Sequence, residues 1–172
     1  MKLMTKRLKK LFTPDYMFPD LLQVDFQTLA DQGYKLILLD IDNTLALHGA
    51  SVADDYARQV IGRVQEAGLV CQIITNAMWK RARQYAAGLD VSVRAQAGKP
   101  STYGIRKACL AAGIAPEQCV MIGDQLLTDV LAARRAGCLA ILVRPRTTKE
   151  PWTIQARRKL ENFFWGRRDH LD

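Results

Sequence analysis

Residues 36–44 read Leu-Ile-Leu-Leu-Asp-Ile-Asp-Asn-Thr, and this stretch decides the fold class. Its first half is a run of Leu and Ile without polar alternation, which is typical of a strand buried on both faces of a parallel sheet. Its second half places Asp40 and Asp42 where that strand opens into a loop. Ligands of open α/β sheets bind outside the carboxyl ends of such strands, so both carboxylates are candidates for chemistry.

Two carboxylates this close together repel each other and raise each other's pKa unless a cation lies between them. Hard oxygen ligands of this kind suit Mg²⁺. An isolated Asp-x-Asp has a simpler interpretation, a strand followed by an Asx turn, because Asp, Asn and Thr are common turn residues. The rest of the chain decides between the two interpretations.

Three more polar signals lie beside predicted elements, in a fixed order along the chain. The first and third directly follow apolar runs, and the second precedes a helical segment. They are Thr75-Asn76 after residues 70–74, Gly98-Lys99-Pro100 before residues 101–113, and Gly123-Asp124 after residues 119–122, with Asp129 five positions further on.

Apolar runs and helical segments alternate, which predicts an α/β fold with a parallel sheet, right-handed crossovers and helices on both faces. Gly68, Gly113 and Gly137 stand where helices should end. The expected strands are 35–41, 69–75, 91–95, 119–123 and 139–143, and the expected helices are 52–67, 78–88, 101–113 and 127–136.

The chain resembles the haloacid dehalogenase (HAD) superfamily in all four of its motifs. These are the motif around Asp40, Thr75, Lys99, and the motif of Asp124 and Asp129. The resemblance covers roughly residues 35 to 145, and its details look most like the YqeG-type phosphatases of subfamily IIIA. That group is similar to the mitochondrial phosphatidylglycerophosphatases. The resemblance implies a Rossmann-like HAD domain with strand order 5-4-1-2-3 and Asp40 on the central strand.

The resemblance also implies roles for the two motif aspartates and a Mg²⁺ cofactor. Asp40 would be the nucleophile that forms an aspartyl-phosphate and would bind the metal through its other oxygen. Asp42 would protonate the leaving alcohol and later activate water, which requires a raised pKa, while its backbone carbonyl touches the metal. Asp124 would be the third metal ligand. For Asp129, direct coordination, a water-bridged contact and a supporting role behind the ligands all stay open.

Thr75 and Lys99 would hold the phosphoryl oxygens, by a hydroxyl hydrogen bond and an ammonium charge. Asn76 would help to shape the pocket. Taken alone, Thr75 would be interpreted as a helix N-cap and Lys99 as a solvated loop cation. Asn43 replaces the Gly that is commonest in the superfamily, and Asn tolerates left-handed backbone geometry.

The length of 172 residues and the 49% of hydrophobic residues predict one domain over residues 1–172. Apolar runs are too short for a transmembrane segment, and the N-terminus lacks a signal-peptide pattern, so a cytoplasmic location is expected. The four cysteines have neither zinc-site spacing nor disulfide density, so reduced thiols are expected. Neither loop around the motifs has room for a cap domain, so we expect an open pocket that a phosphate on a large molecule or surface can reach.

The net charge of +8 resides at the chain ends, because residues 11–143 hold 12 Lys and Arg against 13 Asp and Glu. Residues 1–12 and an expected helix at 151–165 are basic and amphipathic, so they can contact an anionic membrane surface. Packing of 151–165 on the domain and disorder of 1–12 are the alternatives.

These observations predict a Mg²⁺-dependent phosphomonoesterase, with phosphatidylglycerophosphate as the preferred substrate and peripheral contact with the inner face of the membrane. Two alternatives stay open: a phosphatase of a soluble sugar or nucleotide phosphate, and a basic accessory protein that binds RNA or the ribosome. The second is weaker because no RNA-binding signature is present.

Overall fold

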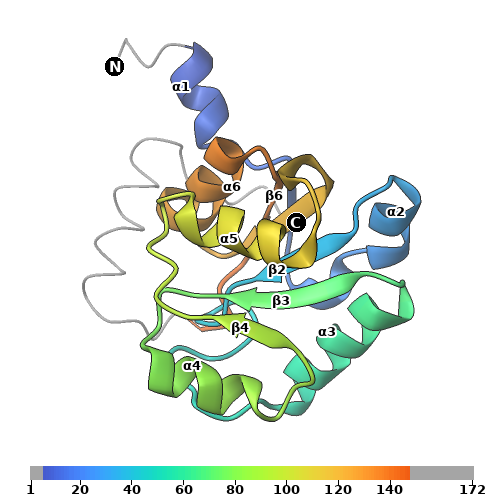
Figure 1. The fold of residues 1–172 in the computed structure, drawn as a ribbon, viewed down its shortest axis with the longest axis vertical. Coiled ribbons are helices and arrows are strands. Elements are labelled where there is room, and N and C mark those ends of the chain that lie inside the picture. Colours follow the sequence, from blue (N-terminus) through green and yellow to red (C-terminus); the bar gives the residue numbers. More distant parts are fainter. Residues whose placement is uncertain (1–5, 148–172) are drawn as a thin grey trace.

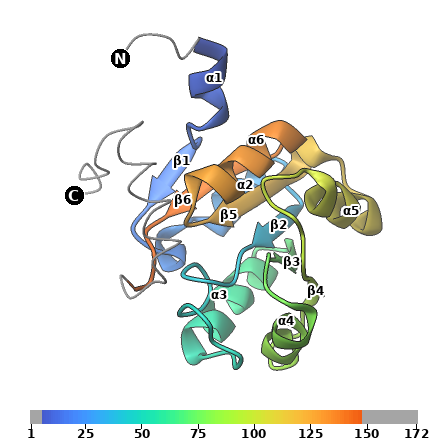
Figure 2. The same cartoon turned by 90° about the vertical axis from the view of Figure 1, so that its left-hand side faces the viewer.

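The computed structural model describes residues 6–147, which form one six-stranded parallel sheet with helices on both faces (Figures 1 and 2). The spatial order of the strands is β1-β6-β5-β2-β3-β4. The strands are β1 Tyr16–Phe18, β2 Leu36–Leu39, β3 Val70–Ile74, β4 Ser92–Arg94, β5 Cys119–Gly123 and β6 Leu139–Val143.

The strand order differs from the predicted 5-4-1-2-3 because an additional strand, β1, lies at one edge of the sheet. The five predicted strands correspond to β2 to β6 and stand in the expected relative order, with β2 inside the sheet. The unpredicted β1 pairs in parallel with β6, and Asp15 beside it accepts a hydrogen bond from the Ala140 backbone N–H at 2.8 Å. β1 lies before the alternation of apolar runs and helical segments on which the prediction rests, and its three residues alone give no clear sequence signal.

The four predicted helices are present, although each is somewhat shorter than expected. Asp54 caps the first of them by accepting a hydrogen bond from the Ala57 backbone N–H at 2.9 Å, so this helix begins at Asp55. Gly113 and Gly137 adopt left-handed backbone geometry at the ends of two others. The helices are α1 Lys6–Leu11, α2 Phe26–Asp31, α3 Asp55–Glu66, α4 Trp79–Ala86, α5 Tyr103–Ala112 and α6 Leu131–Ala136.

Three short helical turns complete the described part of the chain, and one of them changes a prediction. The segment Leu126–Val130 is a π-helical turn that runs directly into α6, where the sequence predicted a regular helix from residue 127. The other two are 3₁₀ turns at Leu21–Gln23 and Pro116–Gln118. Turns of the π type occur often at functional sites, and this one carries Asp129.

The two faces of β2 pack into different hydrophobic clusters, as expected for a strand covered on both sides. Ile37 and Leu39 pack with residues of α2, α3 and α4, whereas Leu36 and Leu38 pack with residues of α5 and α6. All four side chains are fully buried. The central strand is therefore rigidly held, and the chain that leaves its end starts from a fixed position.

The basic ends are only partly described. The N-terminal segment contributes α1, which projects from the body of the molecule above α6 (Figure 1). The predicted helix at 151–165 lies outside the described residues. No helix among the described residues is long and apolar enough to span a membrane. All four cysteines are free and buried.

Candidate active site

Six of the seven predicted site residues come together at the carboxyl edge of the sheet, the edge that faces the viewer in Figure 2. Asp40 directly follows β2 and Thr75 directly follows β3, so both lie at the ends of neighbouring strands. Lys99 arrives from the loop before α5, and Asp129 from the π-helical turn. These residues line one pocket of about 440 Å³, together with Asp42 and Asn76.

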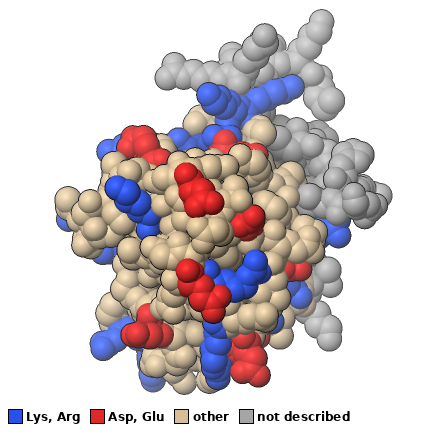
Figure 3. Space-filling view, turned by 90° about the vertical axis from the view of Figure 1, so that its right-hand side faces the viewer, with Lys and Arg blue, Asp and Glu red and all other residues tan. Residues whose placement is uncertain are grey.

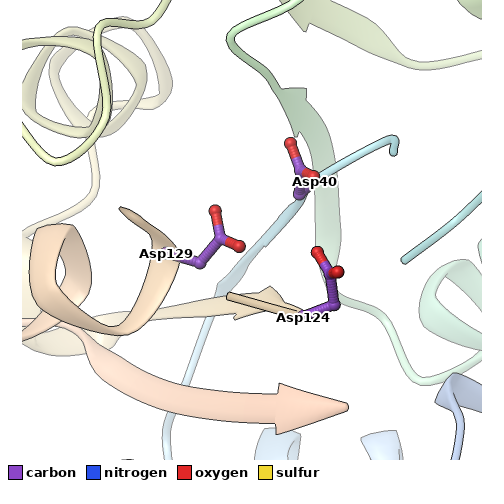
Figure 4. Close-up of side chains that lie close together, drawn as sticks. All are labelled: Asp40, Asp124 and Asp129. Carbon is purple, nitrogen blue, oxygen red and sulfur yellow. The ribbon is translucent and has the colours of Figure 1, made fainter. Parts of the chain in front are cut away.

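Three aspartates lie close together here, and two of them, Asp40 and Asp129, line the pocket. Figure 4 shows the carboxylates of Asp40, Asp124 and Asp129 pointing toward a common space, and one oxygen of each lies within 4.8 Å of the others. All three are buried, with exposed fractions of 5%, 0% and 1%. Three carboxylates this close and this dry repel strongly unless positive charge lies among them.

Lys99 supplies part of that positive charge. Its ammonium nitrogen lies 2.7 Å from Asp40 Oδ1 and 2.6 Å from Asp129 Oδ1, and it also donates to the Ile74 carbonyl at 3.0 Å. Burial alone would lower the pKa of Lys99, but the Asp129 and Asp40 carboxylates outweigh burial and raise it. Lys99 is therefore a buried, permanently charged ammonium and not the solvated loop cation of the simpler interpretation.

Burial has the opposite effect on Asp40. Loss of water around the carboxyl raises its pKa to about 6, although the neighbouring Lys99 opposes this shift. The Asp40 carboxyl is thus held at the end of a buried strand with a pKa of about 6, and a further cation nearby would stabilise its charged form.

Asp42 lies on the outer side of the pocket. Its carboxylate forms a two-point ion pair with the guanidinium of Arg81, with Nη1 at 3.1 Å from Oδ1. It also accepts a hydrogen bond from the Gly49 backbone N–H at 2.8 Å, and His48 Nδ1 lies 3.5 Å away. The next residue, Asn43, takes a left-handed conformation with φ 59°, a geometry that asparagine tolerates.

Thr75 and Asn76 shape the wall between Asp40 and Lys99. The Thr75 hydroxyl is buried and accepts a hydrogen bond from the Ala77 backbone N–H at 3.1 Å, and it does not cap α4. The Asn76 side chain binds both backbone groups of Lys99, accepting from its N–H and donating to its carbonyl at 2.9 Å each. Asn76 thereby fixes the loop that delivers the buried ammonium.

The Asp129 side chain reaches this cluster by packing closely against the backbone of Gly123. A Cβ atom at Gly123 would lie 2.3 Å from Asp129 Cγ, so only glycine allows the carboxylate to cross the end of β5. Asp129 also accepts a hydrogen bond from the Gln125 backbone N–H at 3.1 Å.

The aspartate cluster fits a divalent cation. Carboxylate oxygens are the ligands that hard divalent ions prefer, and the three buried negative charges exceed the single charge of Lys99. Gln125 Oε1, in the wall of the same pocket, is a buried oxygen for which the described residues provide no hydrogen-bond donor. Asp40, Asp124 and Asp129 are the residues that would hold the ion.

Comparisons with known proteins show the family to which this chain belongs. Residues 96–161 match the model of the HAD-hydrolase-like family. The chain is 30% identical to the probable phosphatase YqeG of Bacillus subtilis over 154 residues, which cover 90% of each protein. The chain belongs to the HAD hydrolase family. It is a phosphatase, in keeping with the relatives and with a pocket built of acidic groups around a buried lysine.

A second relative of this HAD phosphatase is phosphatidylglycerophosphate phosphatase 1 of Chlamydomonas reinhardtii, which is 29% identical over 92% of this chain and 63% of its own length. Among solved structures, the cobalt-bound deoxy-D-mannose-octulosonate 8-phosphate phosphatase of Haemophilus influenzae has a TM-score of 0.53. It is 15% identical over 77% of each chain, so it supports the fold alone.

Sequence reasoning missed several residues of the HAD phosphatase pocket. Arg81 and His48 lie in its wall beside Asp42, and Thr44 donates a hydrogen bond to Asp124 at 3.3 Å. Arg81 could have been suspected, because a helix that follows a strand begins at the same sheet edge and its first turn faces the site. Nothing in the local sequence distinguishes Arg81 from Lys80 and Arg83, which are exposed.

Proposed function

We propose that this HAD phosphatase hydrolyses phosphomonoesters through an aspartyl-phosphate on Asp40, with Mg²⁺ as its metal. The observation that carries the proposal is the position of Asp40 at the end of β2, inside the cluster of three buried carboxylates and beside Lys99. Such a carboxylate can attack phosphorus from a fixed position, because the strand behind it is buried on both faces.

The surrounding residues have the chemistry for the other steps. Lys99 and the Thr75 hydroxyl would bind the phosphoryl oxygens and offset their negative charge as the group is transferred to Asp40. Asp42 would donate a proton to the leaving oxygen and then take one from the attacking water, which releases phosphate and restores Asp40. The ion pair between Asp42 and Arg81 has to open before Asp42 can do so.

We assign the metal to Asp40, Asp124 and Asp129, with the backbone carbonyl of Asp42 as a further ligand. Once bound, Mg²⁺ would neutralise the negative charge that collects on the phosphoryl oxygens. Asp129 binds Lys99 and the Gln125 backbone, and both contacts orient its carboxylate.

For the substrate we propose phosphatidylglycerophosphate, met by a peripheral cytoplasmic protein on the inner face of the membrane. The algal relative is named for this activity, and an Arabidopsis thaliana protein of the same name is 23% identical over 89% of this chain. The described loops between Asp42 and β3, and between β3 and Lys99, hold single helices and short segments but no cap domain. A phosphate presented at a surface can therefore enter the pocket.

The test is phosphate release from phosphatidylglycerophosphate in vesicles, beside a panel of soluble phosphomonoesters, with Mg²⁺ and with a chelator. The variant Asp40→Asn serves as the blank, because it removes the nucleophile with little change in size. Selective, Mg²⁺-dependent lipid turnover supports the proposal. Turnover of a soluble ester alone keeps the mechanism and contradicts the lipid substrate.

Absence of turnover on every substrate would favour the accessory RNA-binding role, which predicts salt-sensitive RNA binding that Asp40→Asn leaves unchanged. The surface at the amino ends of the strands gives this role no support. Figure 3 shows acidic and basic side chains interspersed on that face, whereas nucleic-acid binding needs a surface of predominantly positive charge.

A further inference from the structure

The mouth of the active-site pocket carries a group of exposed apolar side chains. The described residues include eight large exposed hydrophobic side chains, and three of them, Leu47, Met78 and Trp79, lie in or beside the pocket wall. Met78 is itself a lining residue, Leu47 precedes the lining residue His48, and Trp79 follows Met78. Their exposed fractions are 50%, 68% and 48%.

These side chains belong to two segments that are joined into one wall. The loop after Asp42 and helix α4 lie side by side in Figures 1 and 2. Arg81 donates a hydrogen bond to the Ala50 carbonyl at 3.1 Å, and the Tyr85 hydroxyl donates to the Leu45 carbonyl at 3.3 Å. These hydrogen bonds hold the two segments, and the exposed apolar side chains they carry, next to each other.

Positive charge accompanies the apolar side chains. Lys80 and Arg83 are exposed on α4, and the guanidinium of Arg83 lies 5.4 Å from the centroid of the Trp79 ring. Neither α4 nor the loop at 43–53 contains an acidic residue. We call Leu47, Met78, Trp79, Lys80 and Arg83 the rim.

We propose that the rim is a membrane-docking surface that binds bilayers containing anionic phospholipid, a proposal that rests on the lipid substrate of the proposed function. A tryptophan beside exposed cations suits the interface of a bilayer, where the ring is partly buried and the cations meet anionic head groups. Met78 of the rim lines the pocket that contains Asp40, so docking there would bring lipid phosphates to the pocket mouth.

The position of the rim is what separates this proposal from general attraction to a membrane. The basic terminal segments would draw the chain toward an anionic surface in many orientations. The rim would select the orientation in which the carboxyl edge of the sheet faces the lipid. An uncapped pocket needs such an orientation, since its opening has to meet a phosphate that cannot leave the bilayer.

The first test measures co-sedimentation of the full chain with phosphatidylcholine vesicles, with and without phosphatidylglycerol. We expect Trp79→Ser and Leu47→Ser each to weaken binding to the anionic vesicles roughly tenfold, because buried apolar area is lost. The matched control is Leu110→Ser, which removes an exposed leucine at the far end of α5 and should bind as the unsubstituted chain does.

Charge is tested separately. The double variant Lys80→Gln and Arg83→Gln should lose roughly fivefold in binding for each cation removed. The control is Arg106→Gln with Lys107→Gln, an exposed pair on α5 where Lys107 lies 5.8 Å from the Tyr103 ring centroid. Equal losses in both double variants would overturn the proposal, because binding would then follow net charge and not the rim.

Fluorescence gives a measurement that does not depend on a destabilising substitution. In a chain with Trp152→Phe and Trp165→Phe, Trp79 is the remaining tryptophan. We expect its emission to shift to shorter wavelength when anionic vesicles are added, and to stay unchanged with vesicles of phosphatidylcholine alone. An unchanged emission with both vesicle types would overturn the proposal and leave the rim as a contact surface for a protein.

These measurements keep the docking surface and the proposed function apart, because vesicle binding is read without turnover. If rim variants bind vesicles normally while the chain still hydrolyses phosphatidylglycerophosphate, the docking proposal fails and the function stands. If binding depends on the rim but only soluble esters are hydrolysed, the lipid substrate fails and the docking surface stands. Activity on a soluble ester also reports whether each rim variant is folded.

Discussion

Lys99 is the buried cation that compensates the negative charges of Asp40 and Asp129. Its ammonium is almost completely buried and contacts both Asp40 and Asp129. We expect Lys99→Met to destabilise the metal-free protein by about 3–5 kcal/mol, because removing one partner leaves uncompensated buried charge. Urea unfolding with a chelator present measures the loss, and added Mg²⁺ should recover part of it.

The control for this experiment is Lys35→Met, which removes an exposed lysine and should change stability little. A Lys99→Met protein as stable as the unsubstituted chain would contradict the assignment of Lys99 as a buried, charged group. Phosphate release by Lys99→Met should be strongly reduced at saturating Mg²⁺, since the variant lacks a cation beside the phosphoryl group.

The raised pKa of Asp40 predicts that the stability of the metal-free protein depends on pH. Its pKa rises on folding from 3.8 to about 6, so the folded state binds more protons than the unfolded state between these values. Its contribution to stability is therefore present below about pH 4 and is lost as pH rises through about 6. Thermal unfolding with a chelator should show this loss, and Asp40→Asn should lack it.

Mg²⁺ binding should follow the opposite trend for the same reason. A metal ligand has to be deprotonated, so apparent Mg²⁺ affinity should fall about tenfold for each pH unit below the pKa of Asp40. Titration of the protein with Mg²⁺ at several pH values measures this slope. Affinity that stays constant across this range would contradict either the raised pKa or the role of Asp40 as a ligand.

At the scale of elements, the close contact between β5 and the π-helical turn controls the position of Asp129. Gly123→Ala would place a Cβ atom 2.3 Å from Asp129 Cγ, so the carboxylate has to move. We expect apparent Mg²⁺ affinity to fall roughly 10- to 100-fold, as when an orienting contact of a metal ligand is removed. The Mg²⁺ dependence of phosphate release measures the change.

Gly62 in α3 is the matched glycine for this experiment. A Cβ atom there would meet nothing within 4 Å, and its helical conformation suits alanine. Gly62→Ala should therefore stabilise the protein by about 0.5–1 kcal/mol and leave the Mg²⁺ dependence unchanged. If the two substitutions affected Mg²⁺ affinity equally, the contact between Gly123 and Asp129 would not be what positions the ligand.

At the scale of the whole molecule, the separation between a nearly neutral body and basic ends predicts how truncation acts. Removing residues 1–12 takes away five of the 25 basic residues. We expect hydrolysis of vesicle-bound substrate to fall more than hydrolysis of a soluble chromogenic ester, because attraction to an anionic surface is lost. Parallel assays of both substrates measure the difference, and equal losses would contradict membrane attraction through the N-terminus.

Much of the fold was predictable because its signals are local. The apolar runs that became β2, β3 and β5 are buried strands whose ends deliver Asp40, Thr75 and Asp124 in the expected order. The terminal glycines Gly113 and Gly137 ended helices as predicted. These features depend on periodicity and backbone preference, which are properties of short stretches of chain. The edge strand β1 lacks a signal of this kind and was missed.

The sequence by itself determined the α/β class, the positions of strands β2 to β6, and the aspartates and Lys99 at the carboxyl edge. The tertiary structure alone decided which of them touch: Lys99 lies between Asp40 and Asp129, while Asp42 turns outward to Arg81. It also placed His48 and Met78, the sequence neighbours of the exposed Leu47 and Trp79, in the wall of one pocket. The physical reason is that local patterns fix the direction of the chain, whereas contacts between distant residues depend on how strand ends, loops and helices pack.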